Sequence, residues 1–178
     1  MLRVRDLSVD LDTHRGTVRV LDGVSFEVAP GEILGVVGES GAGKSMTGAA
    51  VIGLIEPPGR ISAGTVELNG ERIDTLRGED IRRIRGRHIG SVFQDPLTSL
   101  NPMYTIGRHL VETIRTHLPV NEAEARRRAV ALLADVEITD PEASLNQYPH
   151  QFSGGMRQRV AIARALCAEP RLLIADEP

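Results

Sequence analysis

The chain has 178 residues, of which 41% are hydrophobic and 25% charged, a composition that indicates a globular fold and excludes intrinsic disorder. Its formal net charge of −3 gives no global attraction to nucleic acid or to an anionic membrane surface. The only cysteine, Cys167, excludes an internal disulfide, fits a reducing compartment and is interpreted as a small buried apolar side chain. The amino-terminal residues lack the apolar core of a secretory signal, and no window approaches the roughly 18 apolar residues of a membrane span.

Strand patterns dominate the first half of the chain. Alternating apolar and polar residues predict strands at 2–11 and 24–29, and residues 65–70 predict a strand that closes on an Asn-Gly turn. The continuous apolar runs at 33–37 and 88–94 predict strands that are buried on both faces.

The second half begins with a turn-rich stretch at 95–105, in which Pro96 and Pro102 block a helix. Asn121 and Ser153 are predicted N-caps of two of the helices that follow. Helical patterns cover 106–118, 121–136 and 153–170.

Residues 171–176 return to the pattern of a buried strand. The order of elements predicts that this strand rejoins the early strands in one sheet. The simplest architecture is therefore a mainly parallel sheet interrupted by a helical insertion.

A phosphate-binding loop is predicted at residues 38–45, GESGAGKS, which match G-x-x-x-x-G-K-[ST] at every fixed position. Glycines allow backbone N–H groups to approach the phosphates, and the following helix adds partial positive charge at its N-terminus. Lys44 is expected to reach the β- and γ-phosphates, and the Ser45 hydroxyl to bind Mg²⁺. A chance glycine turn is disfavoured by the strand pattern before the motif and the helical pattern after it. The nucleotide-contacting residues predicted here are Gly38, Glu39, Ser40, Gly41, Ala42, Gly43, Lys44, Ser45 and Met46.

An acidic pair follows the last strand pattern. Asp176 stands where the apolar run ends, at the edge of the sheet where ligands of such folds bind, and is expected to organise Mg²⁺. Glu177 is then the candidate general base for the attacking water. A solvated acidic pair after a strand is the alternative, which the phosphate loop in the same chain disfavours.

A second candidate anion site opens the helix that begins near residue 153. Ser153, Gly154, Gly155 and Met156 leave the first amides of the helix uncovered. Since the chain already has one phosphate loop, this second site is expected to serve a nucleotide that another copy or a partner holds.

These motifs together resemble the ATP-binding subunit of an ABC transporter. Residues 38–45 are similar to its Walker A motif, LLIADE at 172–177 to its Walker B, and FSGGMRQ at 152–158 to its signature, with Phe152 and Met156 as departures. The resemblance implies that Gln94 is the Q-loop glutamine, which senses Mg²⁺ and the attacking water. Without the resemblance, Gln94 is best interpreted as a polar residue at the end of a strand. The resemblance also implies a catalytic set of Lys44, Gln94 and Glu177, and a metal set of Ser45, Gln94 and Asp176.

The implied fold is an α/β P-loop NTPase with a mainly parallel core sheet, an N-terminal antiparallel β subdomain and a helical subdomain. The expected division is a nucleotide-binding core with Walker A at 1–93, the Q-loop and helical subdomain at 94–168, and a return to the core with Walker B at 169–178.

The strings FQDPLTSLNPMYTIG and YPHQFSGGMRQRV resemble the dipeptide, oligopeptide and nickel uptake branch of the family. This branch implies ATP and Mg²⁺ as cofactors and a location on the cytoplasmic face of the inner membrane. It implies a second ABC ATPase held head to tail, as homo- or heterodimer, two membrane permeases and an extracytoplasmic solute-binding protein, with no nucleic acid. The cargo among dipeptides, oligopeptides and nickel stays open. Alternatives are a nucleotide-binding remnant without turnover and an ABC ATPase that acts on DNA or ribosomes.

Two departures from the family pattern bear on function. The usual adenine-stacking aromatic falls near Arg15, beside His14, where either a stacked guanidinium or a solvated arginine fits. The family also continues past Walker B into a D-loop, a switch histidine and further sheet, so residues 1–178 are expected to be a truncated chain with an open sheet edge and weak or no hydrolysis.

The remaining charged residues have simpler interpretations. The arginines at 82, 83, 85 and 87 are expected on a solvated face, and those at 126–128 in a surface helix with Glu122 and Glu124 as ion-pair partners. The histidines show no spacing typical of metal ligands.

Overall fold

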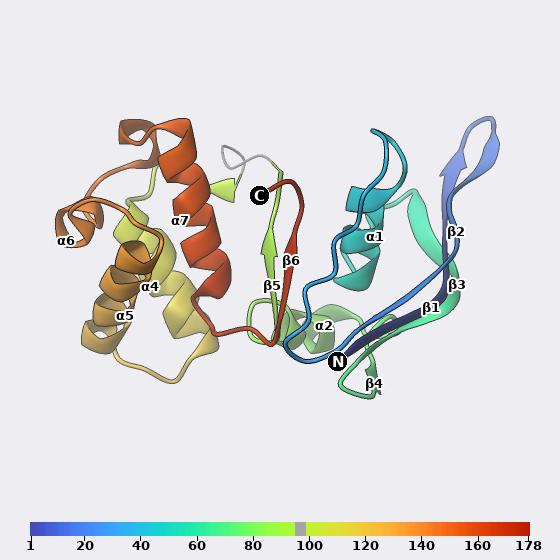
Figure 1. Cartoon of the computed structure of the whole chain (residues 1–178), viewed down its shortest axis with the longest axis horizontal. Coiled ribbons are helices and arrows are strands. Elements are labelled where there is room, and N and C mark those ends of the chain that lie inside the picture. The colour runs from blue at the N-terminus through green and yellow to red at the C-terminus, as the bar shows by residue number, and fades with distance from the viewer. Residues whose placement is uncertain (95–98) are drawn as a thin grey trace. The chain divides into compact units, whose positions relative to one another are not determined.

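The computed structural model describes residues 1–94 and 99–178 (Figure 1). The predicted turn at Pro96 lies outside the described residues. The chain divides into two compact units, Met1–Arg82 and Arg83–Pro178, and each is described by itself. The helix α2, Gly78–Ile84, crosses the boundary between them in the sequence.

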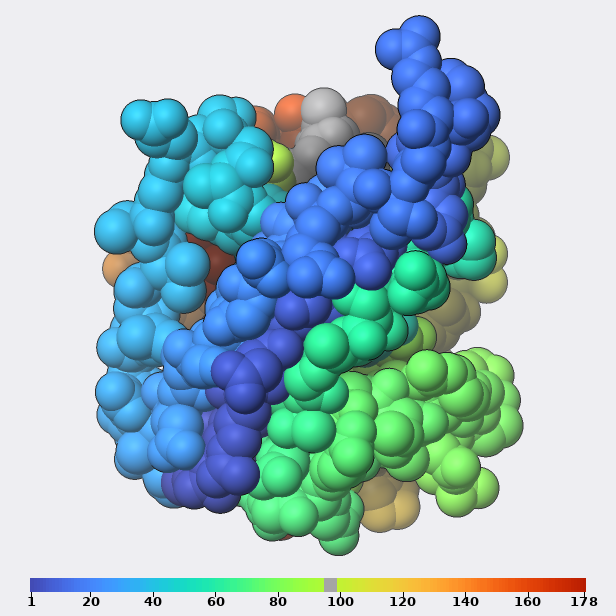
Figure 2. Space-filling view, turned by 90° about the vertical axis from the view of Figure 1, so that its right-hand side faces the viewer, coloured from blue at the N-terminus to red at the C-terminus, as the bar shows by residue number. Residues whose placement is uncertain are grey.

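The first unit is built on a four-stranded antiparallel sheet of order β2-β1-β3-β4. Figure 2 shows the blue and green strands of this sheet running side by side. The strands predicted from alternation are confirmed, and the predicted Asn-Gly turn joins β3 to β4, with both turn residues, Asn69 and Gly70, at positive φ. The strand bounds are β1 Leu2–Thr13, β2 Gly16–Val28, β3 Gly59–Leu68 and β4 Glu71–Arg72.

Irregular pairing in β1 changes which of its residues face the core. The register against β2 shifts between Val4 and Leu7 and again between Leu7 and Val9, so Leu7, Ser8, Val9 and Asp10 are all buried in succession. A simple two-residue alternation would bury only every second one of these residues. The bulge therefore brings a carboxylate into the sheet beside apolar side chains.

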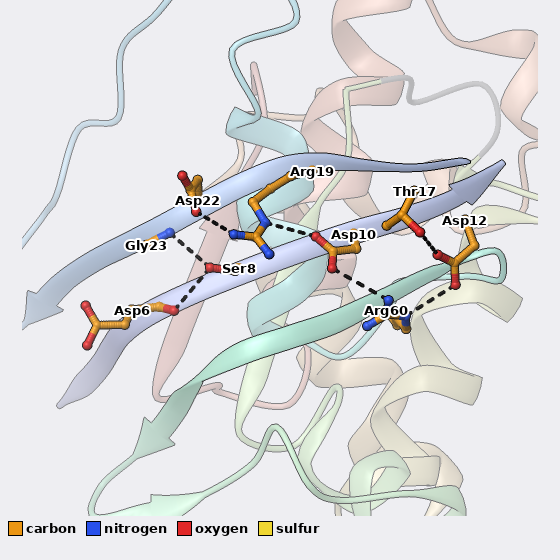
Figure 3. Close-up of polar contacts among 9 residues, drawn as sticks. All are labelled: Asp6, Ser8, Asp10, Asp12, Thr17, Arg19, Asp22, Gly23 and Arg60. Atoms are coloured by element: carbon orange, nitrogen blue, oxygen red, sulfur yellow. Dashed lines mark hydrogen bonds and ion pairs between the residues drawn. The ribbon is translucent and has the colours of Figure 1, made fainter. Parts of the chain in front are cut away.

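The buried carboxylate of Asp10 is neutralised by arginines from both neighbouring strands (Figure 3). Arg19 Nε of β2 lies 3.1 Å from Asp10 Oδ1, and Arg60 Nη2 of β3 lies 3.6 Å from Asp10 Oδ2. Arg60 also pairs with Asp12 at 3.3 Å, and Arg19 with Asp22 at 3.1 Å. The hydrogen bond from Arg19 lowers the pKa of Asp10 from its ordinary value. This network links the three long strands on one face.

The predicted strand at 33–37 is wrong. The structure assigns no strand to this stretch, which pairs with none of the described strands, and Ile33 and Val37 are 96% and 94% exposed. An apolar run becomes a buried strand only where neighbours supply hydrogen bonds and cover both faces, and none of the described strands does so here. The helix α1, Lys44–Val51, follows as predicted.

The second unit contains a two-stranded parallel sheet, formed by β5, Ile89–Val92, and β6, Leu172–Ala175. The prediction that the last strand rejoins the early strands is confirmed for β5 alone among the described strands. β6 is also less buried than predicted, since its residues alternate between half-buried and exposed.

A helical core forms the larger part of this unit. Asn121 and Ser153 cap α5 and α7 as predicted, and Thr105 caps α4, which the sequence analysis had not proposed. The core includes Leu110 and Leu133 in full burial. The elements are α4 Ile106–His117, α5 Glu122–Asp135, α6 Pro141–Ser144, the 3₁₀ helix η1 Pro149–Gln151 and α7 Gly154–Leu166.

Two minor predictions have different outcomes. Cys167 is buried in the helical core, and burial raises the pKa of its thiol to about 12, so it behaves as an apolar side chain as expected. On α5, Glu124 pairs with Arg128 at the predicted four-residue spacing and also with Arg127, but Glu122 pairs with Arg115 of α4 at 3.4 Å. Glu122 thus takes its partner from another helix, where the four-residue spacing predicts Arg126 of its own helix.

In the part of the chain that the structure describes, two features are absent: a cluster of side chains that could hold a metal ion, and a helix that could cross a membrane. Within residues 1–94 and 99–178 there is no group of three His, Cys, Asp or Glu side chains that could hold a metal ion. In the same ranges, no helix combines the length and the apolar character needed to cross a bilayer.

Asp10→Asn tests whether the ion network stabilises the sheet. Because the folded-state pKa of Asp10 is lowered, its stabilising effect is present above the unfolded pKa of about 3.9 and is lost as pH falls through the folded pKa. We expect the variant to be less stable than the wild type at pH 7, with the difference shrinking as the pH falls below about 4, in urea unfolding followed by circular dichroism. Asp22→Asn is the matched control, because this exposed partner of Arg19 should change stability little at either pH. A difference for Asp10→Asn that persists undiminished in acid contradicts the interpretation.

Candidate functional site

The glycine-rich loop at 38–45 is closed by its own lysine. Lys44 Nζ donates to the carbonyl of Gly38 at 2.8 Å and to that of Glu39 at 3.0 Å, which ties the end of the loop to its beginning. Gly41 and Gly43 have φ of 82° and 89°, a region that costs other residues about 1–2 kcal/mol. The loop is thus curved around the ammonium group of Lys44, as a phosphate cradle requires.

The start of α1 offers backbone N–H groups without a side-chain competitor. Gly43 is the N-cap and makes no side-chain hydrogen bond, and the first turn holds no acidic residue. The first helical bond runs from Thr47 N to Gly43 O at 2.8 Å, so the amides of Lys44, Ser45 and Met46 precede the helical ladder. Together with the helix dipole they form a site suited to an anion.

Thr47 has a role at this site that the sequence analysis missed. Its hydroxyl donates to the Gly43 carbonyl at 2.9 Å, beside the backbone bond from its own N–H. The sequence could have predicted this bond, because threonine hydroxyls in helices commonly donate to the carbonyl four residues earlier. The Ala42 N–H, predicted to face phosphate, donates to the Glu39 carbonyl at 3.1 Å in this structure.

The acidic pair lies at the carboxyl edge of the β5–β6 sheet. Parallel pairing sets Val92 opposite Ala175, and the N–H of Asp176 continues the ladder to the Val92 carbonyl at 3.0 Å. Gln94 follows β5, and its Nε2 donates to Glu177 Oε2 at 2.6 Å. The structure therefore brings Gln94 into contact with Glu177 and to the same sheet edge as Asp176, although Gln94 is far from both acids in the sequence.

The second glycine motif forms the exposed start of α7. The Ser153 hydroxyl accepts from the Met156 N–H at 3.3 Å, and Phe152 before it is buried in the helical core. Gly154 and Gly155 are exposed, and a Cβ added to either would meet nothing within 4 Å. The preceding turn is fixed by Gln151, whose side chain accepts from the Tyr148 N–H at 2.8 Å. The anchored serine and phenylalanine thus present two bare backbone positions to solvent.

The predicted site residues fall into three groups. Lys44, Ser45 and their loop belong to the first unit, whereas the acidic edge and the start of α7 belong to the second. That Lys44 and the terminal carboxylates meet around one magnesium-bound triphosphate stays a prediction. Arg15 and His14 lie exposed in the turn between β1 and β2, where the Arg15 N–H donates to the Thr13 hydroxyl at 3.3 Å.

A family model described as ABC transporter matches residues 21–178. The chain belongs to the ABC transporter family. The α/β P-loop ATPase fold class predicted from its motifs is confirmed by the solved structures described below, although the parallel sheet that the structure describes has only two strands.

Relatives of this ABC transporter chain include two peptide transport proteins. It is 46% identical to the dipeptide transport ATP-binding protein DppD of Escherichia coli K12, over 100% of this chain and 54% of that protein. It is also 46% identical to the oligopeptide transport ATP-binding protein OppD of Bacillus subtilis 168, over 100% of this chain and 50% of that protein. The chain thus spans about half the length of the curated relatives it matches.

Solved ABC cassettes share the fold of this ABC transporter chain. The ATP-binding cassette MJ0796, in a dimeric post-hydrolysis state bound to ADP and Pi, superposes with a TM-score of 0.88 at 28% identity, over 99% of this chain and 73% of that one. The cassette cbiO1 from Clostridium perfringens, part of the transporter complex cbiONQ, gives 0.77 at 29% identity, over 99% of this chain and 65% of that one.

Gly43→Ala tests whether the phosphate loop depends on its glycine N-cap. An added Cβ would lie 2.6 Å from Leu21 Cδ2, and Leu21 is itself buried. We expect a loss of about 1–2 kcal/mol for the left-handed conformation and roughly 1–3 kcal/mol more for overpacking, measured by urea unfolding. Gly41→Ala is the control, because Gly41 also has positive φ but faces open space, so only the first loss applies. Equal losses for the two variants would show that the contact with Leu21 is unimportant.

Proposed function

We propose that this chain is the nucleotide-binding part of an ATPase subunit that energises the import of dipeptides or oligopeptides. The observation that carries the proposal is the phosphate loop, where Lys44 closes the loop and the first amides of α1 precede its ladder. The 46% identity to DppD and OppD over the whole chain supports peptides as cargo, in place of the nickel that the sequence left open.

The loop residues would bind the triphosphate of ATP. The amides of Lys44, Ser45 and Met46 and the Lys44 ammonium supply donors and positive charge for the phosphate oxygens, with the other residues at 38–43 forming the cradle. Glu177 would accept a proton from a water molecule while the oxygen of that water forms a bond to the γ-phosphorus. The bond from that phosphorus to the β,γ-bridging oxygen then breaks, giving ADP and inorganic phosphate.

Mg²⁺ fits the donor types that this chain provides. The Ser45 hydroxyl, the Gln94 amide oxygen and the Asp176 carboxylate are oxygen donors, which this hard cation prefers. Asp176 and Gln94 also lie at the same edge of one sheet. When bound, the ion would neutralise charge on the phosphate oxygens.

A second ATPase subunit is the proposed partner at the start of α7. Ser153, Gly154 and Gly155 would receive the γ-phosphate of a nucleotide held by that subunit in a head-to-tail dimer. The dimeric state of the cassette MJ0796 supports this arrangement. In the assembly we propose, two membrane permeases and an extracytoplasmic binding protein complete an importer, with this subunit on the cytoplasmic face.

Nucleotide binding without turnover is the second candidate. It is favoured by the exposed stretch at 33–37, which leads directly into the phosphate loop and is unpaired among the described strands. A loop mounted on an unpaired segment keeps its hydrogen bonds to phosphate but holds the reacting groups less firmly.

Two substitutions separate these candidates. Lys44→Ala should weaken ATP binding roughly 10- to 100-fold, since a hydrogen bond to a charged group contributes about 1.5–3 kcal/mol. Glu177→Gln should leave ATP affinity within about threefold but lower hydrolysis by roughly 10²- to 10⁴-fold. Affinity is measured by calorimetric titration and turnover by phosphate release. Unchanged affinity in Lys44→Ala would refute the loop assignment, and absence of turnover in the wild type would favour the second candidate.

Gly154→Asp tests the proposed role of α7 in the dimer. An acidic residue at the first helical position interacts favourably with the helix dipole, so the free energy of unfolding should stay unchanged or rise by about 0.3–1 kcal/mol. The same charge would repel a phosphate, so dimers formed with ATP in the Glu177→Gln background should disappear in size-exclusion chromatography. Gly154→Ala is the neutral control at the same open position. ATP-dependent dimers that survive Gly154→Asp would exclude this helix start from the interface.

A further inference from the structure

The register of the parallel sheet places two distant residues side by side. Val92 lies opposite Ala175, and the Asp176 N–H continues the pairing to the Val92 carbonyl at 3.0 Å. Gln94 and Glu177 each follow their strand by two residues, so they meet although 83 positions separate them in the sequence. This meeting is a property of the register, because a slip of one residue would move each side chain to the other face.

The contact between them has a defined direction. Gln94 Nε2 lies 2.6 Å from Glu177 Oε2. An ionised carboxylate can only accept, so the amide nitrogen must face it, and the oxygen of the same amide points elsewhere. Glu177 has a φ of 47°, so the chain turns out of the strand direction at the residue that makes the contact.

We propose that Gln94 is a positioning residue for Glu177, whose amide N–H holds the carboxylate in one orientation at the edge of the sheet. The inference rests on the proposed function, in which Glu177 accepts a proton from the attacking water. Both residues are exposed, so without this bond the glutamate would distribute over several rotamers. The amide N–H affects the reaction through the carboxylate, while the amide oxygen stays available as a ligand for Mg²⁺.

A double-mutant cycle in the full-length protein isolates this contact. Gln94→Glu keeps an oxygen at the end of the side chain but replaces the N–H donor, so two carboxylates face each other. We expect kcat to fall roughly 10- to 100-fold while ATP affinity measured without Mg²⁺ stays within about threefold, because the base is displaced and the phosphate loop is not. In the Glu177→Gln background the same change recreates an amide–carboxylate pair, so it should lower the residual single-turnover rate by less than about twofold. Equal factors in both backgrounds, or a parallel loss of ATP affinity, would overturn the proposal.

A measurement that needs no nucleotide tests the contact itself. The side-chain amide resonances of Gln94 should shift on Glu177→Ala in ¹⁵N-labelled protein. Glu169→Ala is the control, because this exposed glutamate pairs with Arg128 and should leave them in place. Resonances that ignore Glu177→Ala would refute the contact. If the resonances shift on Glu177→Ala but the wild-type protein hydrolyses no ATP, the contact is confirmed and the proposed function is overturned.

Discussion

The parallel pairing of β5 with β6 is the constraint on which the acidic edge of the second unit depends. Four residues of each strand pair in register, and the ladder continues to Asp176. The register therefore brings Gln94, Asp176 and Glu177 to one edge of this sheet, where the Gln94 amide donates to the Glu177 carboxylate. A site built on the end of a sheet is positioned more firmly than one on a free loop, since the ladder fixes where each chain leaves.

Two helices of the chain begin with uncovered backbone amides, but their N-caps differ. At α1 the N-cap is a glycine in the left-handed conformation, and Lys44 folds back onto two loop carbonyls. At α7 the N-cap is Ser153, which satisfies one amide with its own hydroxyl, and two exposed glycines follow. The first arrangement curves a loop around the ammonium group of Lys44, whereas the second leaves the helix start exposed to solvent.

The antiparallel sheet of the first unit shows how a charge is accommodated inside a strand. Bulges in β1 bury Asp10 next to apolar residues, and arginines on both neighbouring strands neutralise it. A buried charge without partners would be costly, so the two arginines and the bulge belong together. The sheet that packs against the start of α1 is in this way joined across three strands; Leu21 of β2 is the residue that meets Gly43.

The sequence by itself determined the features that depend on neighbours along the chain. The phosphate loop, the caps at Asn121 and Ser153 and the turn at Asn69 are such features, because backbone angles and short-range hydrogen bonds decide them. The tertiary structure alone decided which strands pair and which side chains meet. The apolar run at 33–37 has the composition of a buried strand but pairs with none of the described strands. Glu122 forms its ion pair with Arg115, which belongs to another helix. Likewise, only the β5–β6 register revealed the bond from Gln94 to Glu177, because burial and long-range contact depend on residues that no local pattern identifies.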